Sequence, residues 1–161
     1  LLSGMGHRRI GFVGDESAPH VRRERLLRRM LGQNGMGMRS EWIIRASAAG
    51  MGDPSGLGVP DGPTALIAAD DAMAQSVLRF LYDRGIRVPA DVSLAGMDDI
   101  PSARLTIPAL TTVRHPVATL VRKAFERVTR SSGTTRKAVR GPFVVAPELV
   151  VRESCAPPAA E

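Results

Sequence analysis

Cysteine and aromatic residues are scarce in this chain of 161 residues, which contains one Cys, one Trp, one Tyr and four Phe. A single cysteine excludes a disulfide within the chain, and this favours a reducing compartment. Cys155 lies in the C-terminal stretch ESCAPPAAE, which we expect to be frayed and therefore unsuited to hold a catalytic thiol beside a base. The core must consist mainly of Val, Leu, Ile, Ala and Met.

Long apolar runs are also absent, because no segment approaches the ~20 apolar residues that a membrane helix needs. The first residues, LLSGMGHRRI, do not form a basic-then-apolar leader of the signal-peptide kind. We therefore expect a cytoplasmic protein with no membrane partner. With 43% apolar and 24% charged residues, the composition is typical of one ordinary globular domain.

The net charge of +6 raises the question of nucleic-acid binding. The positive excess is not in the middle of the chain, where residues 61–116 carry five basic and seven acidic groups. The arginines are scattered over expected helix faces or lie in a loop, and no aromatic residues are interleaved with them as single-strand binding requires. We expect solvated helix surfaces, and no DNA binding by this chain itself.

Short apolar segments alternate with amphipathic ones along the chain. We predict strands at 9–14, 42–46, 64–69 and 92–96, and two further short strands at 143–145 and 149–151. Helices are predicted at 21–31, 71–83 and 116–128, and polar or glycine-rich loops at 50–62 and 130–141. Strands that alternate with helices indicate βαβ units, and hence an α/β fold with a parallel sheet.

Aspartates follow three of the predicted strands: Asp15 the first, Asp70-Asp71 the third and Asp98-Asp99 the fourth. Ligands of parallel sheets bind beyond the carboxyl ends of the strands, so these side chains should converge on one rim. Asp70 or Asp71 should cap the following helix, and for Asp71 capping is the preferred interpretation. Asp98 is the best candidate for ligand contact, because Asp99 and the residue after it can already form the turn.

Three kinds of chemistry could use these carboxylates. A hard metal ion could bind them, although adjacent aspartates seldom point at one ion and no His or Glu completes a ligand set. Hydrolysis could use Ser17 with His20 or His115, although Ser17 lacks the sharp turn that such a nucleophile needs. A neutral polyol such as a sugar could donate hydroxyl hydrogen bonds to the aspartates while an arginine brackets it. We favour the polyol and expect no metal ion. We also expect no cofactor, since the G-x-G-x-x-G motif of a dinucleotide site does not follow any strand.

Four segments together resemble a known family. GHRRIGFVG, PTALIAADDAMA, RGIRVPADVSLAGMDDIPSARLTIPALTTVRHP and PELVVRES resemble, in order and spacing, the C-terminal part of lactose-repressor-type (LacI/GalR) transcription regulators. The resemblance implies a periplasmic-binding-protein-like (type I) effector domain of two α/β lobes, with a flavodoxin-like strand order. It also implies a small-molecule effector, no enzymatic activity, a homodimer, and DNA binding through a helix-turn-helix outside this sequence. Secreted sugar-binding proteins of transport systems share the fold and are the alternative.

The resemblance divides the chain between the two lobes. It assigns 6–112 to the core of the second lobe, 113–130 to a crossing and a helix of the first lobe, 131–141 to a polar loop, 142–154 to returning strands and 155–161 to a tail. The helix of the first lobe should then lack its packing partner. Its apolar residues are Val117, Leu120, Val121, Ala124 and Phe125.

Effector-binding roles also follow from the resemblance. Asp98 matches the effector-binding aspartate of the family, and Asp70 matches a polar residue before a helix that also touches the ligand. The effector-contacting arginine matches Arg23, with Arg25 as the competing position because RERL resembles the same motif. Asp15 completes the expected rim. The family pattern is changed nearby at Leu26, Met97 and Gln75-Ser76, so the resemblance does not name the effector.

Overall fold

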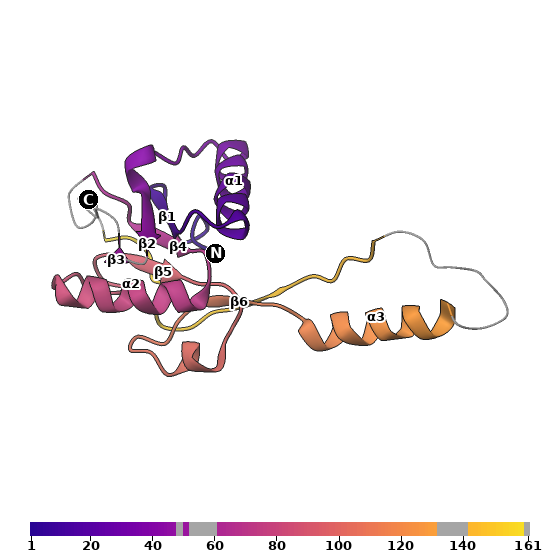
Figure 1. Ribbon diagram of the computed structural model, residues 1–161. Coiled ribbons are helices and arrows are strands. Elements are labelled where there is room, and N and C mark those ends of the chain that lie inside the picture. The colour runs from indigo at the N-terminus through magenta and orange to yellow at the C-terminus, as the bar shows by residue number, and fades with distance from the viewer. Residues whose placement is uncertain (48–49, 52–60, 132–141, 160–161) are drawn as a thin grey trace.

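The structure is a computed structural model that describes residues 1–47, 50–51, 61–131 and 142–159. Figure 1 shows an α/β body from which one long arm extends. The chain leaves the body through β6, forms helix α3 at a distance from it, and returns beside β6. The body contains the predicted rim of aspartates, and the arm contains the predicted crossing.

The body is built on a five-stranded sheet in the order β3-β2-β1-β4-β5. Its parallel strands are β1 (Ile10–Gly14), β2 (Ile43–Ser47), β4 (Ala65–Ala68) and β5 (Ser93–Ala95). Isolated parallel bridges, Ala95–Thr111 and Asp98–Arg114, align the following segment with the open side of β5. The parallel strands therefore follow the predicted flavodoxin-like order.

Two helices cover opposite faces of this sheet, α1 (Ala18–Gln33) on one and α2 (Asp71–Asp83) on the other (Figure 1). Successive strand residues join different apolar clusters, because side chains alternate between the faces of a sheet. Phe12 packs in the cluster that includes Leu31 of α1, whereas Val13 packs in the cluster that includes Leu81 of α2. Both faces of β1 are thus buried, which explains its uninterrupted apolar sequence.

The predicted helix 71–83 is confirmed, whereas α1 begins and ends outside the predicted limits of 21–31. Pro19 lies in the first turn of α1. This position suits proline, because a backbone N–H there would have no hydrogen-bond partner within the helix. The sequence predicts one apolar stripe along this helix, and the structure confirms it only in part; the stripe consists of Val21, Leu26, Leu27, Met30 and Leu31. Leu31 is buried, but Leu26 and Met30 are exposed, and the polar residues His20 and Glu24 occupy buried positions instead.

Two 3₁₀ turns, η1 (Ser40–Trp42) and η2 (Pro101–Arg104), connect these elements. The predicted loop at 50–62 is wrong at its start, because β3 (Gly50–Met51) pairs antiparallel with the end of β2. Residues 52–60 of that loop, and 132–141 of the predicted loop at 130–141, lie outside the described residues.

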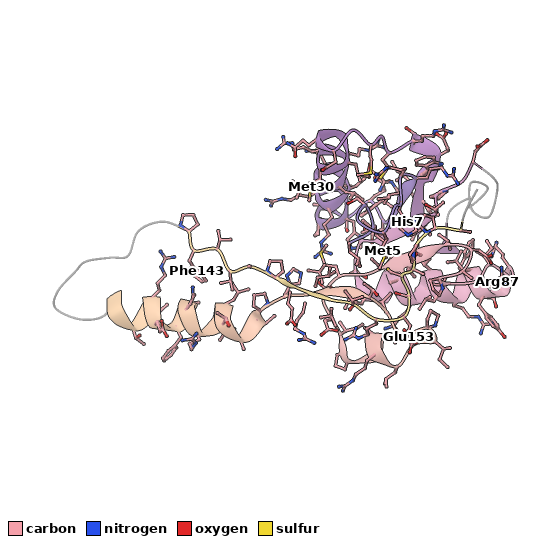
Figure 2. The ribbon with its side chains drawn as sticks, turned by 180° about the vertical axis from the view of Figure 1, so that it is seen from behind. Met5, His7, Met30, Arg87, Phe143 and Glu153 are labelled. Carbon is pink, nitrogen blue, oxygen red and sulfur yellow. The ribbon has the colours of Figure 1, made fainter. Side chains whose placement is uncertain are left out.

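The arm consists of β6 (Thr112–Arg114), α3 (Val117–Ser131) and the antiparallel partner of β6, β7 (Glu148–Val150). The apolar side chains of α3 face solvent, since Val117, Val121, Phe125 and Val128 are 60–68% exposed. The strand predicted at 143–145 is not formed. Phe143 instead lies beside α3, 5.3 Å and 5.8 Å from the cationic groups of Arg127 and Lys123 (Figure 2). The division into lobes remains a prediction.

Residues 153–156 of the C-terminal stretch are docked on the body, so the prediction that this stretch frays is wrong there. Ser154 is fully buried, and its hydroxyl donates to the Leu94 carbonyl at 2.6 Å and accepts from the Thr111 N–H at 2.8 Å. The buried His7 ring contacts the Ala156 carbonyl at 2.8 Å. Burial also raises the pKa of the Cys155 thiol, which makes it a poor nucleophile.

Candidate functional site

The carboxyl ends of β1, β4 and β5 bring Asp15, Asp70 and Asp98 to one edge of the sheet, as the sequence predicts. His20, in the first turn of α1, joins the first two of these aspartates. Its Nδ1 lies 2.7 Å from Asp15 Oδ1, and its Nε2 lies 3.0 Å from Asp70 Oδ2. The His20 ring is buried, whereas the side chains of Asp15 and Asp70 are 41% and 25% exposed, so His20 connects the two strand ends at a partly exposed rim.

Asp70, and not Asp71, caps helix α2. The backbone of Asp70 is extended, and its Oδ1 accepts a hydrogen bond of 2.7 Å from the N–H of Met73. Asp71 is already the first helical residue, so the capping interpretation preferred for it is wrong. Both oxygens of Asp70 are therefore engaged, one by Met73 and the other by His20.

Asp71 lies beneath the rim and is fully buried. Its carboxylate accepts from the Thr112 hydroxyl at 2.6 Å and from the Ile100 N–H at 2.9 Å, and burial raises its pKa. Gly96 makes room for this group, because a Cβ at that position would lie 2.2 Å from Asp71 Oδ1. Asp71 therefore holds the β5 turn and the start of the arm in place.

Asp98 and Asp99 both have backbone conformations that are uncommon for residues other than glycine, with φ of 113° and 54°. This strained turn aims the two carboxylates in different directions. Asp98 Oδ1 lies 3.2 Å from His115 Nε2 and 3.8 Å from Arg23 Nη2, and the Asp98 side chain is 36% exposed. Asp98 is therefore a partly exposed acceptor surrounded by donors.

Asp99, whose side chain is 9% exposed, joins the arm to the body. It accepts from Arg114 Nε at 2.6 Å and from Arg152 Nη2 at 2.5 Å. Burial raises the pKa of the Asp99 carboxyl, but the hydrogen bonds from Arg152 and Arg114 outweigh that effect and hold the pKa below its ordinary value. The adjacent aspartates thus differ in role, Asp99 being structural and Asp98 available at the rim.

Arg23 and Arg25 lie on different sides of helix α1. Arg23 is half-buried, donates to the Ala69 carbonyl at 2.7 Å and faces Asp98. Arg25 lies two positions further, roughly 200° around the helix, and its side chain is exposed. Of the two arginines, Arg23 is the one at the rim.

Sequence reasoning missed the role of His20 as a connection between strand ends. It considered His20 and His115 only as bases for Ser17. Ser17 instead belongs to the turn after β1: its N–H donates to Asp15 Oδ1 at 2.8 Å, and its side chain and backbone together lower the pKa of Asp15. The signal for His20 was its spacing, since a residue three before Arg23 lies on the same helix face.

A cavity of about 500 Å³ lies between α1 and the sheet. Arg23 and Met97 form part of its wall, but most of the lining is apolar and includes Leu2, Phe12 and Leu27. Because a polyol needs several hydrogen-bond partners, the cavity suits it less well than the polar rim outside. Among the described residues, no group of three or more His, Cys, Asp or Glu side chains is arranged to hold a metal ion.

Comparisons with known proteins give a consistent result. Residues 1–155 match the periplasmic binding protein-like domain family. The chain is 34% identical over 163 residues to the HTH-type transcriptional regulator GalS of Salmonella typhimurium, an alignment that covers 97% of this chain and 47% of GalS. No described helix is long and apolar enough to cross a membrane.

Solved structures show the same relationship. A sugar-binding transcriptional regulator of the LacI family from Escherichia coli, complexed with phosphate, aligns with a TM-score of 0.79 and 27% identity over 98% of this chain and 58% of that chain. The lac repressor dimer bound to operator aligns with a TM-score of 0.77 and 27% identity over 96% and 55%.

The family match therefore extends over nearly the whole chain, whereas the chain spans about half the length of the curated relatives that it matches. The parallel strand order and the placement of aspartates at strand ends agree with the sequence resemblance. The chain belongs to the periplasmic-binding-protein-like domain family, in the form found in LacI-family transcriptional regulators.

Proposed function

We propose that the chain is the second lobe of the effector-binding domain of a LacI-family regulator, and that its rim contacts a sugar or another polyol. The environment of Asp98 carries the proposal, because a partly exposed carboxylate lies within 3.8 Å of Arg23 and 3.2 Å of His115. A carboxylate accepts hydrogen bonds from ligand hydroxyls, and a guanidinium donates to hydroxyl or ring oxygens. Asp70 and Asp15 provide acceptors on the neighbouring strand ends.

The exposed apolar face of α3 supports the presence of the first lobe in the complete protein. A row of apolar side chains that are 60–68% exposed along one helix is unusual on a surface that remains in contact with water. In the complete protein, the ligand would close two lobes over the rim and change the affinity of a separate DNA-binding segment by population shift. The regulator would be a cytoplasmic homodimer, and no reaction would occur at the ligand.

A transport-type sugar-binding protein shares the fold and is the second candidate. The relatives described above are transcriptional regulators, which favours the first candidate. The two differ in one measurable property, because only a regulator changes its DNA affinity when the effector binds.

Asp98→Asn in the full-length protein tests the effector role. Effector-dependent release of DNA should weaken by about 10–100-fold, the expected cost of losing one hydrogen bond to a charged group. Asp83→Asn is the matched control, since Asp83 pairs with Arg79 on the exposed surface of α2. An unchanged effector response in Asp98→Asn would contradict the proposed site.

Arg23→Ala and Arg25→Ala provide a second, paired test. Arg23→Ala should weaken the effector response, whereas Arg25→Ala should leave it within about twofold of wild type, because Arg25 is exposed on another side of α1.

The chain of 161 residues alone should not bind monosaccharides with micromolar affinity, since only one side of the proposed ligand site is present. Calorimetric titration measures this directly.

A further inference from the structure

His20 is placed between two carboxylates that come from different strands. It is buried at the start of α1, with Asp15 2.7 Å from Nδ1 and Asp70 3.0 Å from Nε2. Both carboxylates are also fixed by backbone N–H groups, of Ser17 and Met73 respectively. Asp98, in contrast, has no side-chain partner nearer than 3.2 Å among the described residues.

We infer that His20 is a positioning residue of the effector site, which holds Asp15 and Asp70 across the ends of β1 and β4. Because both carboxylates are engaged by His20, Asp98 remains as the main acceptor for the ligand. This inference rests on the proposed function. It goes beyond it by assigning the geometry of the rim to a side chain that need not touch the effector.

The position of Asp15 should depend on one proton. Its carboxylate contacts Nδ1 at 2.7 Å favourably only when Nδ1 carries a hydrogen, whereas the Asp15 N–H, 3.3 Å from the same nitrogen, needs Nδ1 as an acceptor. Apart from the Ser17 N–H, the hydrogen on Nδ1 is therefore what holds the Asp15 carboxylate, which is 41% exposed. The Asp70 carboxylate is held in the same way by Nε2.

The expected result is a lower effector affinity when no side chain joins the two carboxylates. His20→Ala should lower effector affinity by about tenfold, the value of one hydrogen bond to a charged group. His20→Gln and His20→Asn each retain an amide that can reach one of the two carboxylates, so both should recover part of this loss. A merely structural role would give the same loss in all three variants.

Among the described residues, Asp98, Arg23 and His115 also face the site. His115→Gln is the matched control, and the loss of affinity caused by His20→Ala should persist in that background. The full-length protein would be titrated with D-ribose, D-galactose, D-glucose and maltose as probes. An affinity that is unchanged in His20→Ala, or lowered equally in all three His20 variants, would overturn the inference, provided that urea unfolding shows that the variants fold.

A ligand-free measurement separates this inference from the proposed function. In protein labelled with ¹⁵N-histidine, His20 should show a hydrogen on Nε2, and Asp70→Ala should speed the exchange of this hydrogen with solvent. If no probe sugar binds but this signal is present, the effector class is wrong and the positioning of Asp70 by His20 stands. If the Nε2 hydrogen is absent from wild type, the inference fails whatever the sugars do.

Discussion

The space at Gly96 is the most stringent packing requirement near the rim. A Cβ at this position would lie 2.2 Å from Asp71 Oδ1 and 3.0 Å from Leu110 Cδ2. The same Asp71 oxygen accepts the 2.6 Å hydrogen bond from Thr112. Gly96→Ala therefore cannot be accommodated without moving a fully buried carboxylate away from its partner.

The magnitude follows from three contributions. Losing a hydrogen bond to a charged group costs about 1.5–3 kcal/mol. Crowding a packed core costs about 1–3 kcal/mol. The alanine variant has a lower conformational entropy in the unfolded state, which offsets about 0.4–1 kcal/mol of these costs. Gly96→Ala should therefore lower the free energy of unfolding by about 2–5 kcal/mol, a large part of the ~5–15 kcal/mol typical of folded proteins.

Urea unfolding followed by circular dichroism measures this change. Gly32→Ala is the matched control, because no atom lies within 4 Å of a Cβ at Gly32 and the residue is helical. The control should raise the free energy of unfolding by about 0.5–1 kcal/mol through helix propensity. In an Asp71→Ala background the penalty of Gly96→Ala should shrink by at least about 1 kcal/mol. A penalty below about 0.5 kcal/mol, or one unaffected by Asp71→Ala, would refute the reasoning.

Three further predictions concern the tail and the arm. Burial lowers the pKa of His7 from its ordinary 6.5, so the folded state disfavours the protonated ring. The free energy of unfolding should therefore be highest above about pH 6.5 and should fall below that pH, by at most about 1.4 kcal/mol per pH unit. Urea unfolding at pH 7.5 and 5.5 should show this loss of stability, and His7→Gln should abolish the loss. Ser154→Ala leaves the buried Thr111 N–H without its partner and removes one of the hydrogen bonds that the Leu94 carbonyl accepts, so it should cost about 1–3 kcal/mol in the same assay. Ser76→Ala on the exposed face of α2 should change stability by less than about 0.5 kcal/mol. Phe125→Lys on the exposed face of α3 should leave the stability of this chain within about 0.5 kcal/mol and reduce binding of the dye ANS; a larger loss of stability would show that α3 packs against the body.

Local pattern predicted most of the elements. The helix at 71–83 was predicted at its observed limits because an amphipathic period, an aspartate at its start and a glycine after its end agree. The predicted strand at 143–145 failed because short apolar runs carry no information about pairing, and this one lies along the arm without a strand partner. The tail was expected to fray for a related reason, since its polar residues look exposed until their distant partners are known.

The sequence by itself determined that this protein is an α/β chain with a parallel sheet and that aspartates follow its strands, because period and turn chemistry act over neighbouring residues. Only the tertiary structure decided what each aspartate does. Asp71 is buried by Gly96 and Thr112, and Asp99 is paired with Arg152, through contacts that join residues 25–53 positions apart. A carboxylate is fixed by whichever donors surround it in space, and those donors are brought together by the sheet order and not by spacing along the chain.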